Sequence, residues 1–125
     1  MELISKGSVR VVRRETGEVL VPSARWCASR LSRLRGLQLR RRLNPGEALI
    51  LVKPADSVVN SSIHMFFVFF PIAAVWINSQ GRVTSAQLAR PWRPYYASPK
   101  PARYVLETSP AFLSRIAVGD MVDFI

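Results

Sequence analysis

The chain has 125 residues, the size of a single domain, and 49% of them are hydrophobic, so it can bury a substantial core. Its one cysteine, Cys27, cannot form an internal disulfide, which excludes a disulfide-stapled extracellular scaffold. The formal net charge is +10, from 18 basic and 8 acidic residues, and we expect one basic domain over residues 1–125 that needs no disulfide or structural metal.

The N-terminal third predicts a hairpin followed by a helix. Residues 8–14 and 18–21 are rich in β-formers, and Gly17 between them can adopt the positive φ of a tight turn. Ser23 is a candidate N-cap, and Gly36 stands where a left-handed helix cap is expected. The apolar face of this predicted helix carries four residues at helical spacing: Ala24, Cys27, Leu31 and Leu34.

The remainder of the chain predicts short strands. Residues 89–101 hold four prolines and predict an extended loop, while Pro110 predicts a short helix over residues 110–116. Regularly spaced strands with one or two short helices favour a mostly-β, compact sandwich-like or barrel-like domain. The predicted strands are residues 48–52, 63–69, 72–77, 82–88, 102–107 and 121–125.

The basic residues are unevenly distributed. No acidic residue lies between Glu18 and Glu47, or between Asp56 and Glu107. Such asymmetry fits a polyanion partner, but it also fits a basic surface that serves solubility alone, and both interpretations stay open. The first of these stretches contains seven arginines: Arg25, Arg30, Arg33, Arg35, Arg40, Arg41 and Arg42.

Two features bear on location. Met1 to Gly7 is too short and too polar for a secretory signal peptide, so we expect a cytoplasmic protein. The apolar run Ile63 to Ile77 is shorter than the ~20 residues of a membrane-spanning helix and contains Pro71, so it predicts two buried strands and no membrane span.

Few residues carry recognisable chemistry. His64 is the only histidine, and its position within a predicted strand favours a structural role. Cys27 on the apolar helix face is expected to be a small buried side chain, and Asp120 to bond the backbone of a turn. Nucleophile-elbow, phosphate-loop and C-x-x-C motifs are absent. The sequence therefore predicts no catalytic residue, metal ligand or cofactor, and its oligomeric state stays open.

The loop over residues 90–96 interleaves cations with aromatic rings. Trp92, Tyr95 and Tyr96 alternate there with Arg90 and Arg93 on a proline-stiffened backbone. Aromatic rings beside arginines can stack on the bases of single-stranded nucleic acid or on a sugar. The alternative, that these rings lie flat against the sheet, stays open.

The order of several short segments resembles the family known as domain of unknown function 192, over about residues 24–125. This resemblance implies a mostly-β domain with small helical insertions, and it implies no chemistry, because the family has no established activity. Members are often exported, and they commonly carry an aspartate where this chain has Ala73. The segments are Arg35-Gly36-Leu37, the block Ser62 to Phe67, Pro71-Ile72, Pro91-Trp92, Tyr104 to Glu107 and Gly119-Asp120.

Three functional hypotheses follow. The first is a non-enzymatic binding or accessory module whose groove is lined by His64, Phe66 and the loop at Trp92. The second is a weak nucleic-acid or polyanion binder that uses the basic segment 25–42, and the third is a hydrolase that uses His64 and Asp120. The residues of the second hypothesis are Arg30, Arg33, Arg35, Trp92, Arg93, Tyr95 and Tyr96.

Overall fold

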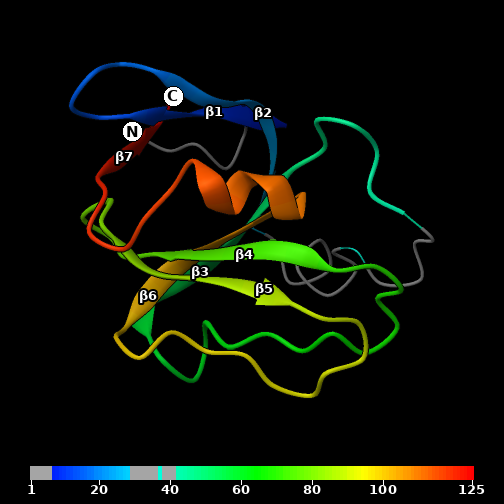
Figure 1. Ribbon diagram of the computed structural model, residues 1–125. Helices are drawn as coiled ribbons and strands as arrows, with labels where there is room; N and C mark the ends of the chain where they lie inside the picture. The colour runs from blue at the N-terminus through cyan, green and yellow to red at the C-terminus, as the bar shows by residue number, and fades with distance from the viewer. Residues whose placement is uncertain (1–6, 29–36, 38–41) are drawn as a thin grey trace.

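The computed structural model describes residues 7–28, 37 and 42–125. The described residues form one seven-stranded sheet with strand order β5-β4-β6-β3-β2-β1-β7 (Figure 1). A short 3₁₀ helix, η1 (Pro110–Ser114), precedes the last strand. The strands are β1 (Ser8–Arg13), β2 (Val19–Cys27), β3 (Leu49–Ser57), β4 (Ile72–Ile77), β5 (Val83–Ala89), β6 (Ala102–Thr108) and β7 (Val122–Phe124).

The sheet curls until its two edge strands touch. Arg82, just before β5, forms an isolated bridge with Met121, just before β7. The Val83 N–H also donates to the Asp120 carbonyl oxygen at 2.8 Å. The sheet is therefore a curled half-barrel, and its paired strands are antiparallel except for β2 and β3, which run parallel.

Two cores lie on the two faces of this sheet. The inner core receives side chains from all seven strands, including Val75 and Leu106. The outer core receives the alternate side chains, such as Trp76 and Val105, and Met65 from the loop before β4 covers it. Successive side chains of a strand point to opposite faces. β4 is buried along its whole length because both of its faces are covered.

The predicted helix start at Ser23 is wrong. β2 continues through this position to Cys27, and it pairs with β3 at Arg25↔Leu49 and Cys27↔Leu51. Ala24 lies in the inner core and Cys27 in the outer core, so the two residues occupy opposite faces of a strand and not one face of a helix. Pairing with β3 outweighs the local helical spacing. The rest of the predicted helix, Gly36 included, lies outside the described residues.

The predicted strand over residues 63–69 is also wrong. Only Ile63 forms a bridge, with Tyr96, and the residues that follow it form turns. Tight turns replace the strand because Phe67 adopts a positive φ, which the backbone of an extended strand does not allow. Among the described residues, no helix is long and apolar enough to cross a membrane.

The other elements confirm the predicted fold class. The turn at Gly17 has a φ of +76° and connects β1 to β2, as the sequence indicates. The predicted strands 48–52, 72–77, 82–88 and 102–107 correspond to β3, β4, β5 and β6. The helix predicted at Pro110 is a shorter 3₁₀ segment that buries Phe112 in the inner core.

Candidate functional site

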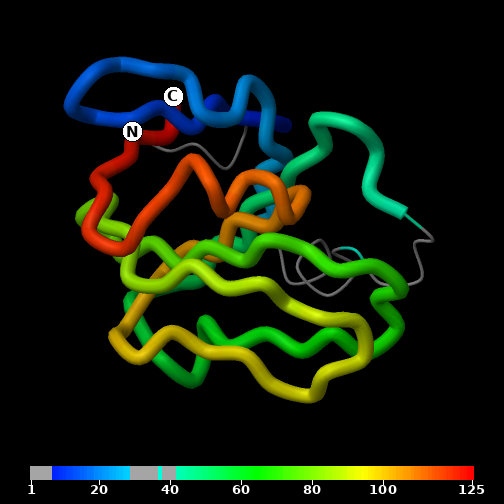
Figure 2. Tube along the Cα trace, in the orientation of Figure 1, coloured from blue at the N-terminus to red at the C-terminus, as the bar shows by residue number. Residues whose placement is uncertain are grey.

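Exposed aromatic side chains gather where the loop before β4 meets the loop after β5, and the two loops run side by side at one end of the fold (Figure 2). The exposed fraction is 40–50% for Phe66, Phe67, Phe69 and Trp92. Single exposed apolar residues are common on soluble proteins, whereas a contiguous apolar patch marks an interaction site. We name this patch the aromatic platform and define it as His64, Phe66, Phe67, Phe69 and Trp92.

The rings of the platform form two contacting groups, one around Trp92 and one of His64 with Phe66, and within each group the rings are tilted and do not stack face to face. The Trp92 ring centroid lies 5.0 Å from that of Phe67 and 5.6 Å from that of Phe69, with interplanar angles of 59° and 66°. The rings of His64 and Phe66 lie 5.1 Å apart. Tilted contacts are favourable for aromatic pairs, and they leave ring faces open to a ligand.

Backbone hydrogen bonds connect the two loops. The Met65 N–H donates to the Arg93 carbonyl oxygen, and the Trp92 N–H donates to the Met65 carbonyl oxygen, both at 2.8 Å. Ile63 and Tyr96 exchange two further hydrogen bonds of 2.9 Å. The relative positions of the platform rings are therefore set by main-chain bonds and not by side-chain packing alone.

Two platform residues have a strained backbone. Phe67 has a φ of 60° and Trp92 a φ of 65°, and no other non-glycine residue of the described ranges has a positive φ. The left-handed region costs a bulky residue about 1 to 2 kcal/mol. Such strain persists only where the surrounding structure enforces it, and it concentrates at binding and catalytic sites.

Buried neighbours hold the platform from below. Met65 and Val68 alternate with the exposed rings and are 1% and 4% exposed in the outer core. The indole N–H of the fully buried Trp76 donates to the Ser61 carbonyl oxygen at 2.8 Å and fixes the chain just before the platform. The Tyr96 hydroxyl accepts a hydrogen bond of 2.8 Å from the backbone N–H of Arg90. The platform thus rests on buried, hydrogen-bonded residues.

The edge of the platform is basic. Arg90 and Arg93 are exposed, and within the described ranges neither guanidinium has a carboxylate partner. No acidic residue occurs between Asp56 and Glu107 in the sequence, and Glu107 is buried. The platform therefore combines accessible ring faces with uncompensated positive charge.

Comparison with known proteins places the chain in a family. The sequence profile of domain of unknown function 192 (DUF192), described as an uncharacterized ACR, matches residues 11–124. The chain belongs to the DUF192 family. The UPF0127 protein of Thermococcus kodakarensis is 36% identical to this DUF192 domain over 96 residues, which cover 75% of this chain and 59% of that relative. The UPF0127 protein of Pyrococcus abyssi is 37% identical over 98 residues, which cover 76% of this chain and 80% of the relative.

The matched region covers only part of two relatives, and two solved structures share the fold. The DUF192 domain spans about three-fifths of the length of the Thermococcus kodakarensis relative and of a second relative from Thermococcus gammatolerans. A solved structure from Sinorhizobium meliloti 1021 aligns with a TM-score of 0.78 over 94% of this chain and 92% of that chain, at 21% identity. A protein of unknown function from Novosphingobium aromaticivorans aligns with a TM-score of 0.76 over 93% of this chain and 83% of that chain, at 20% identity. Likeness at these identities shows the fold.

His64 and Asp120, the pair of the hydrolase hypothesis, lie at opposite ends of the DUF192 sheet. The His64 Nδ1 accepts a hydrogen bond of 3.3 Å from the Phe66 N–H, beside the end of β5. Asp120 lies at the start of β5, where its carboxylate accepts from Arg13 and from the Ala117 N–H at 3.0 and 2.9 Å. A seven-residue strand such as β5 is about 20 Å long, too far for a proton-transfer pair. The predicted role of Asp120 in bonding turn backbone is confirmed.

The structure gathers most of the predicted site residues. His64, Phe66, Trp92, Arg93, Tyr95 and Tyr96 all lie on the two hydrogen-bonded loops, and Tyr95 is 59% exposed. Arg30, Arg33 and Arg35 lie outside the described residues. Phe67 and Phe69 were not among the predicted site residues, because the apolar run from Ile63 predicted a buried strand with both faces covered. The sequence signal that could have found them is the high density of phenylalanines in residues 66–70.

The outer core also contains a buried carboxyl group. Glu107 is 6% exposed, and burial raises its pKa from 4.5 to about 7, although the charge of Lys53 acts in the opposite direction. Cys27 is fully buried, as predicted for a small apolar side chain, and burial raises the pKa of its thiol. Among the described residues, no group of three His, Cys, Asp or Glu side chains is arranged to hold a metal ion.

Proposed function

We propose that this DUF192 domain is a binding module and that its ligand lies on the aromatic platform. The observation that carries the proposal is the strained backbone of Phe67 and Trp92, whose exposed rings lie 5.0 Å apart. Presenting two bulky rings to solvent on left-handed backbone costs free energy twice, through strain and through exposure. A ligand that covers these rings removes them from water and so offsets the free-energy cost of their exposure.

The chemistry of the platform fits single-stranded nucleic acid. Unpaired bases stack on aromatic side chains, and each such contact contributes about 1–3 kcal/mol. Arg90 and Arg93 at the edge of the platform are suited to phosphate, and the net charge of +10 attracts a polyanion. The Sinorhizobium meliloti neighbour carries the description of a candidate transcription regulator, which supports including nucleic acid among the probes.

Single strands fit the platform better than duplexes do. In a duplex the bases stack on one another, so their faces are not available to Phe67 and Trp92. The sequence contains no recognisable motif for reading a DNA groove. We therefore expect weak binding with little sequence preference and a dissociation constant on the order of 10 μM at low salt. The basic segment 25–42, largely outside the described residues, remains a further predicted contributor.

The test is a fluorescence-anisotropy titration of labelled oligothymidylate. A labelled duplex of the same length is titrated in parallel for comparison. Trp92→Ala should weaken single-strand binding between about 5-fold and 100-fold, because one stacking contact is lost. Arg93→Gln should weaken binding and make the plot of log affinity against log salt shallower by about 0.7, the contribution of one phosphate contact.

Val118→Ala is the matched control. Val118 is 66% exposed and lies near the start of β5, away from the platform. Truncating its side chain reduces the exposed apolar surface but removes no contact with a ligand on the platform. The affinity of Val118→Ala for oligothymidylate should equal that of the wild type. Duplex binding as tight as single-strand binding, or an unchanged affinity in Trp92→Ala, would refute the stacking role of the platform.

A further inference from the structure

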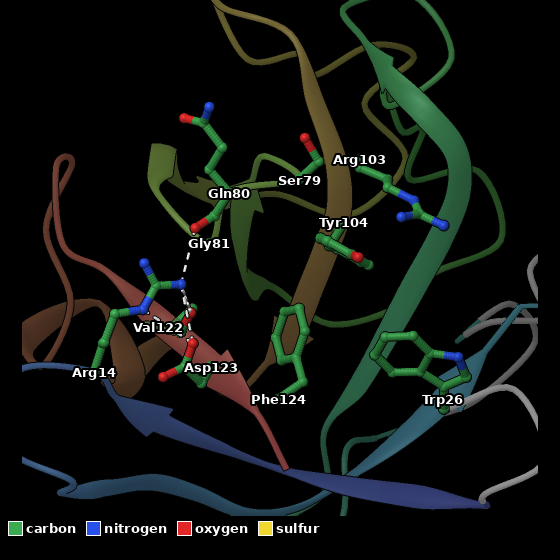
Figure 3. A pocket seen from close by; sticks show the side chains of 10 residues that line it. All are labelled: Arg14, Trp26, Ser79, Gln80, Gly81, Arg103, Tyr104, Val122, Asp123 and Phe124. Carbon is green, nitrogen blue, oxygen red and sulfur yellow. Dashed lines mark hydrogen bonds and ion pairs between the residues drawn. The ribbon is translucent and has the colours of Figure 1, made fainter. Parts of the chain in front are cut away.

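A hollow lies at the end of β4 opposite to the platform. Its walls come from β2, β6 and β7, from the turn between β4 and β5 and from Arg14 just after β1 (Figure 3). Its volume is about 250 Å³. Ile77, at this end of β4, pairs with Tyr104, whereas Ile72, at the platform end, pairs with Ala89. We name this hollow the barrel mouth. Mouths of β-barrels are frequent sites for small ligands.

Three aromatic rings form the floor of the barrel mouth. The Tyr104 and Phe124 ring centroids lie 4.9 Å apart, and Trp26 lies 5.8 Å from Tyr104 and 5.6 Å from Phe124. The rings contact one another directly instead of surrounding a central space, so they make a floor and not a cage. Figure 3 shows the three rings along one side of the hollow and Arg14 on the other. The interplanar angles of these pairs are 46° to 71°, so a flat ligand ring stacks on one of the three rings and not across all of them.

The two arginines of the barrel mouth differ in how far their charge is compensated. Arg14 forms an ion pair of 2.9 Å with Asp123 and also donates to the carbonyl oxygens of Gln80 and Val122. Arg103 donates one hydrogen bond, from its Nε–H to the Lys53 carbonyl oxygen at 2.8 Å. Within the described part of the chain, no carboxylate pairs with Arg103, and neither of its terminal nitrogens has a hydrogen-bond partner.

Arg103 is also held in position by its neighbours. Its guanidinium carbon lies 5.3 Å from the centroid of the Tyr104 ring, within the range of a cation–π contact. The bond to the Lys53 carbonyl fixes the guanidinium from the other side. The two free terminal nitrogens form a preorganised fork next to the aromatic floor, and such a fork matches the two oxygens of a carboxylate or a phosphate.

We propose that the barrel mouth binds a small planar anion, an aromatic or heteroaromatic ring that bears a carboxylate or a phosphate. The ring would stack against one ring of the floor, Trp26, Tyr104 or Phe124, and the anionic group would accept hydrogen bonds from the terminal nitrogens of Arg103. The volume of about 250 Å³ limits the ring system to one or two fused rings. A cationic ligand does not fit, because Asp123 is already paired with Arg14.

The site is formed before any ligand arrives. Gly81 has a φ of +88°, and a Cβ on it would collide with the Arg14 guanidinium and the Val122 carbonyl oxygen. The Val122 N–H donates to the Gly81 carbonyl oxygen at 2.8 Å, which fastens β7 to the turn between β4 and β5. A preformed site loses little free energy to ordering when a ligand binds.

The experiment uses 1-naphthyl phosphate as the probe and follows backbone amide shifts of the wild-type chain. We expect saturable shifts at residues 79–81, 103–104 and 122–124. Arg103→Gln should weaken binding about tenfold or more, because the charged bond to the anion is lost, and Arg103→Lys should restore part of the loss. 1-Naphthylmethylammonium, with the same ring and the opposite charge, should not bind.

Trp92→Ala separates this proposal from the platform proposal. Trp92 is at the other end of β4, so this variant should bind 1-naphthyl phosphate as the wild type does, even though its oligonucleotide binding falls. The proposal is overturned if the wild type shows no saturable shift, if the cation binds as well as the anion, or if Trp92→Ala abolishes the effect. Amide spectra of the Arg103 variants establish that they are folded, so an unchanged affinity in Arg103→Gln also counts against it.

Discussion

The Trp92 N–H donates to the Met65 carbonyl oxygen at 2.8 Å, and this bond joins the loop that precedes β4 to the loop that follows β5. The β4–β5 hairpin brings the two loops together, and the bond holds Trp92 at a φ of 65°. Met65 is buried in the outer core while the Trp92 ring is 46% exposed. This backbone bond therefore connects a core residue of the domain directly to an exposed ring of the aromatic platform.

Strain at Phe67 should be measurable by substitution. Asparagine tolerates left-handed backbone, so Phe67→Asn should leave the free energy of unfolding unchanged or raise it by up to about 1 kcal/mol. The same variant should bind oligothymidylate more weakly, because an exposed ring is lost. Chemical denaturation and anisotropy titration measure the two quantities.

Phe66→Asn is the matched control for this substitution. Phe66 is also an exposed platform ring, at 40%, but its φ is not positive, so the change relieves no strain. Phe66→Asn should therefore be less stable than Phe67→Asn, by about 1 kcal/mol. Equal stabilities of the two variants would show that Phe67 is not strained in solution.

Gly81 should be far less tolerant of substitution than another glycine in the same backbone region. Gly81→Ala adds a Cβ that collides with the Val122 carbonyl oxygen, so we expect a loss of more than about 2 kcal/mol and a disturbed barrel mouth. Gly17→Ala, at a φ of +76° with open space around it, should lose about 1 kcal/mol. Thermal or chemical unfolding of the two variants gives the comparison, and similar losses would mean that β7 does not pack against Gly81 as described.

The buried carboxyl of Glu107 should make stability depend on pH. Its pKa is about 7 in the folded chain and near 4.5 when exposed, so the folded state binds more protons between these values. The free energy of unfolding should then fall as pH rises from 4.5 to 7, by about 3 kcal/mol from this group. Glu107→Gln should flatten the profile over this window, as measured by denaturation at several pH values. A profile identical to that of the wild type would contradict the assignment.

Local patterns in the sequence account for much of the fold. The apolar run of β4, the glycine turn after β1 and the proline that opens η1 each act through neighbours in the chain, so they were predictable. Ala24 and Cys27 were placed on a helix because a spacing of three residues is helical in isolation. Their strand conformation depends on pairing with β3, which is distant in sequence and has no local signal.

The candidate sites were predictable to different degrees. Trp92 and Arg93 belong to a compact sequence motif, so composition alone offered a binding loop as one of two open interpretations. The outward turn of Phe67 depends on its positive φ, and the apolar run around it predicted a strand instead. The barrel mouth could not be predicted, because Trp26, Tyr104 and Phe124 come from three strands that meet only in the folded sheet.

The most direct test of the platform is a map of backbone amide shifts during titration with unlabelled oligothymidylate at low salt. We predict that the largest saturable shifts fall on residues 63–69 and 90–96, and that they shrink in Trp92→Ala. Shifts of this kind would locate the bases on the rings of Phe67 and Trp92. An absence of shifts at saturating oligonucleotide, or shifts confined to residues outside these two loops, would contradict the proposal that the aromatic platform is the binding surface of this domain.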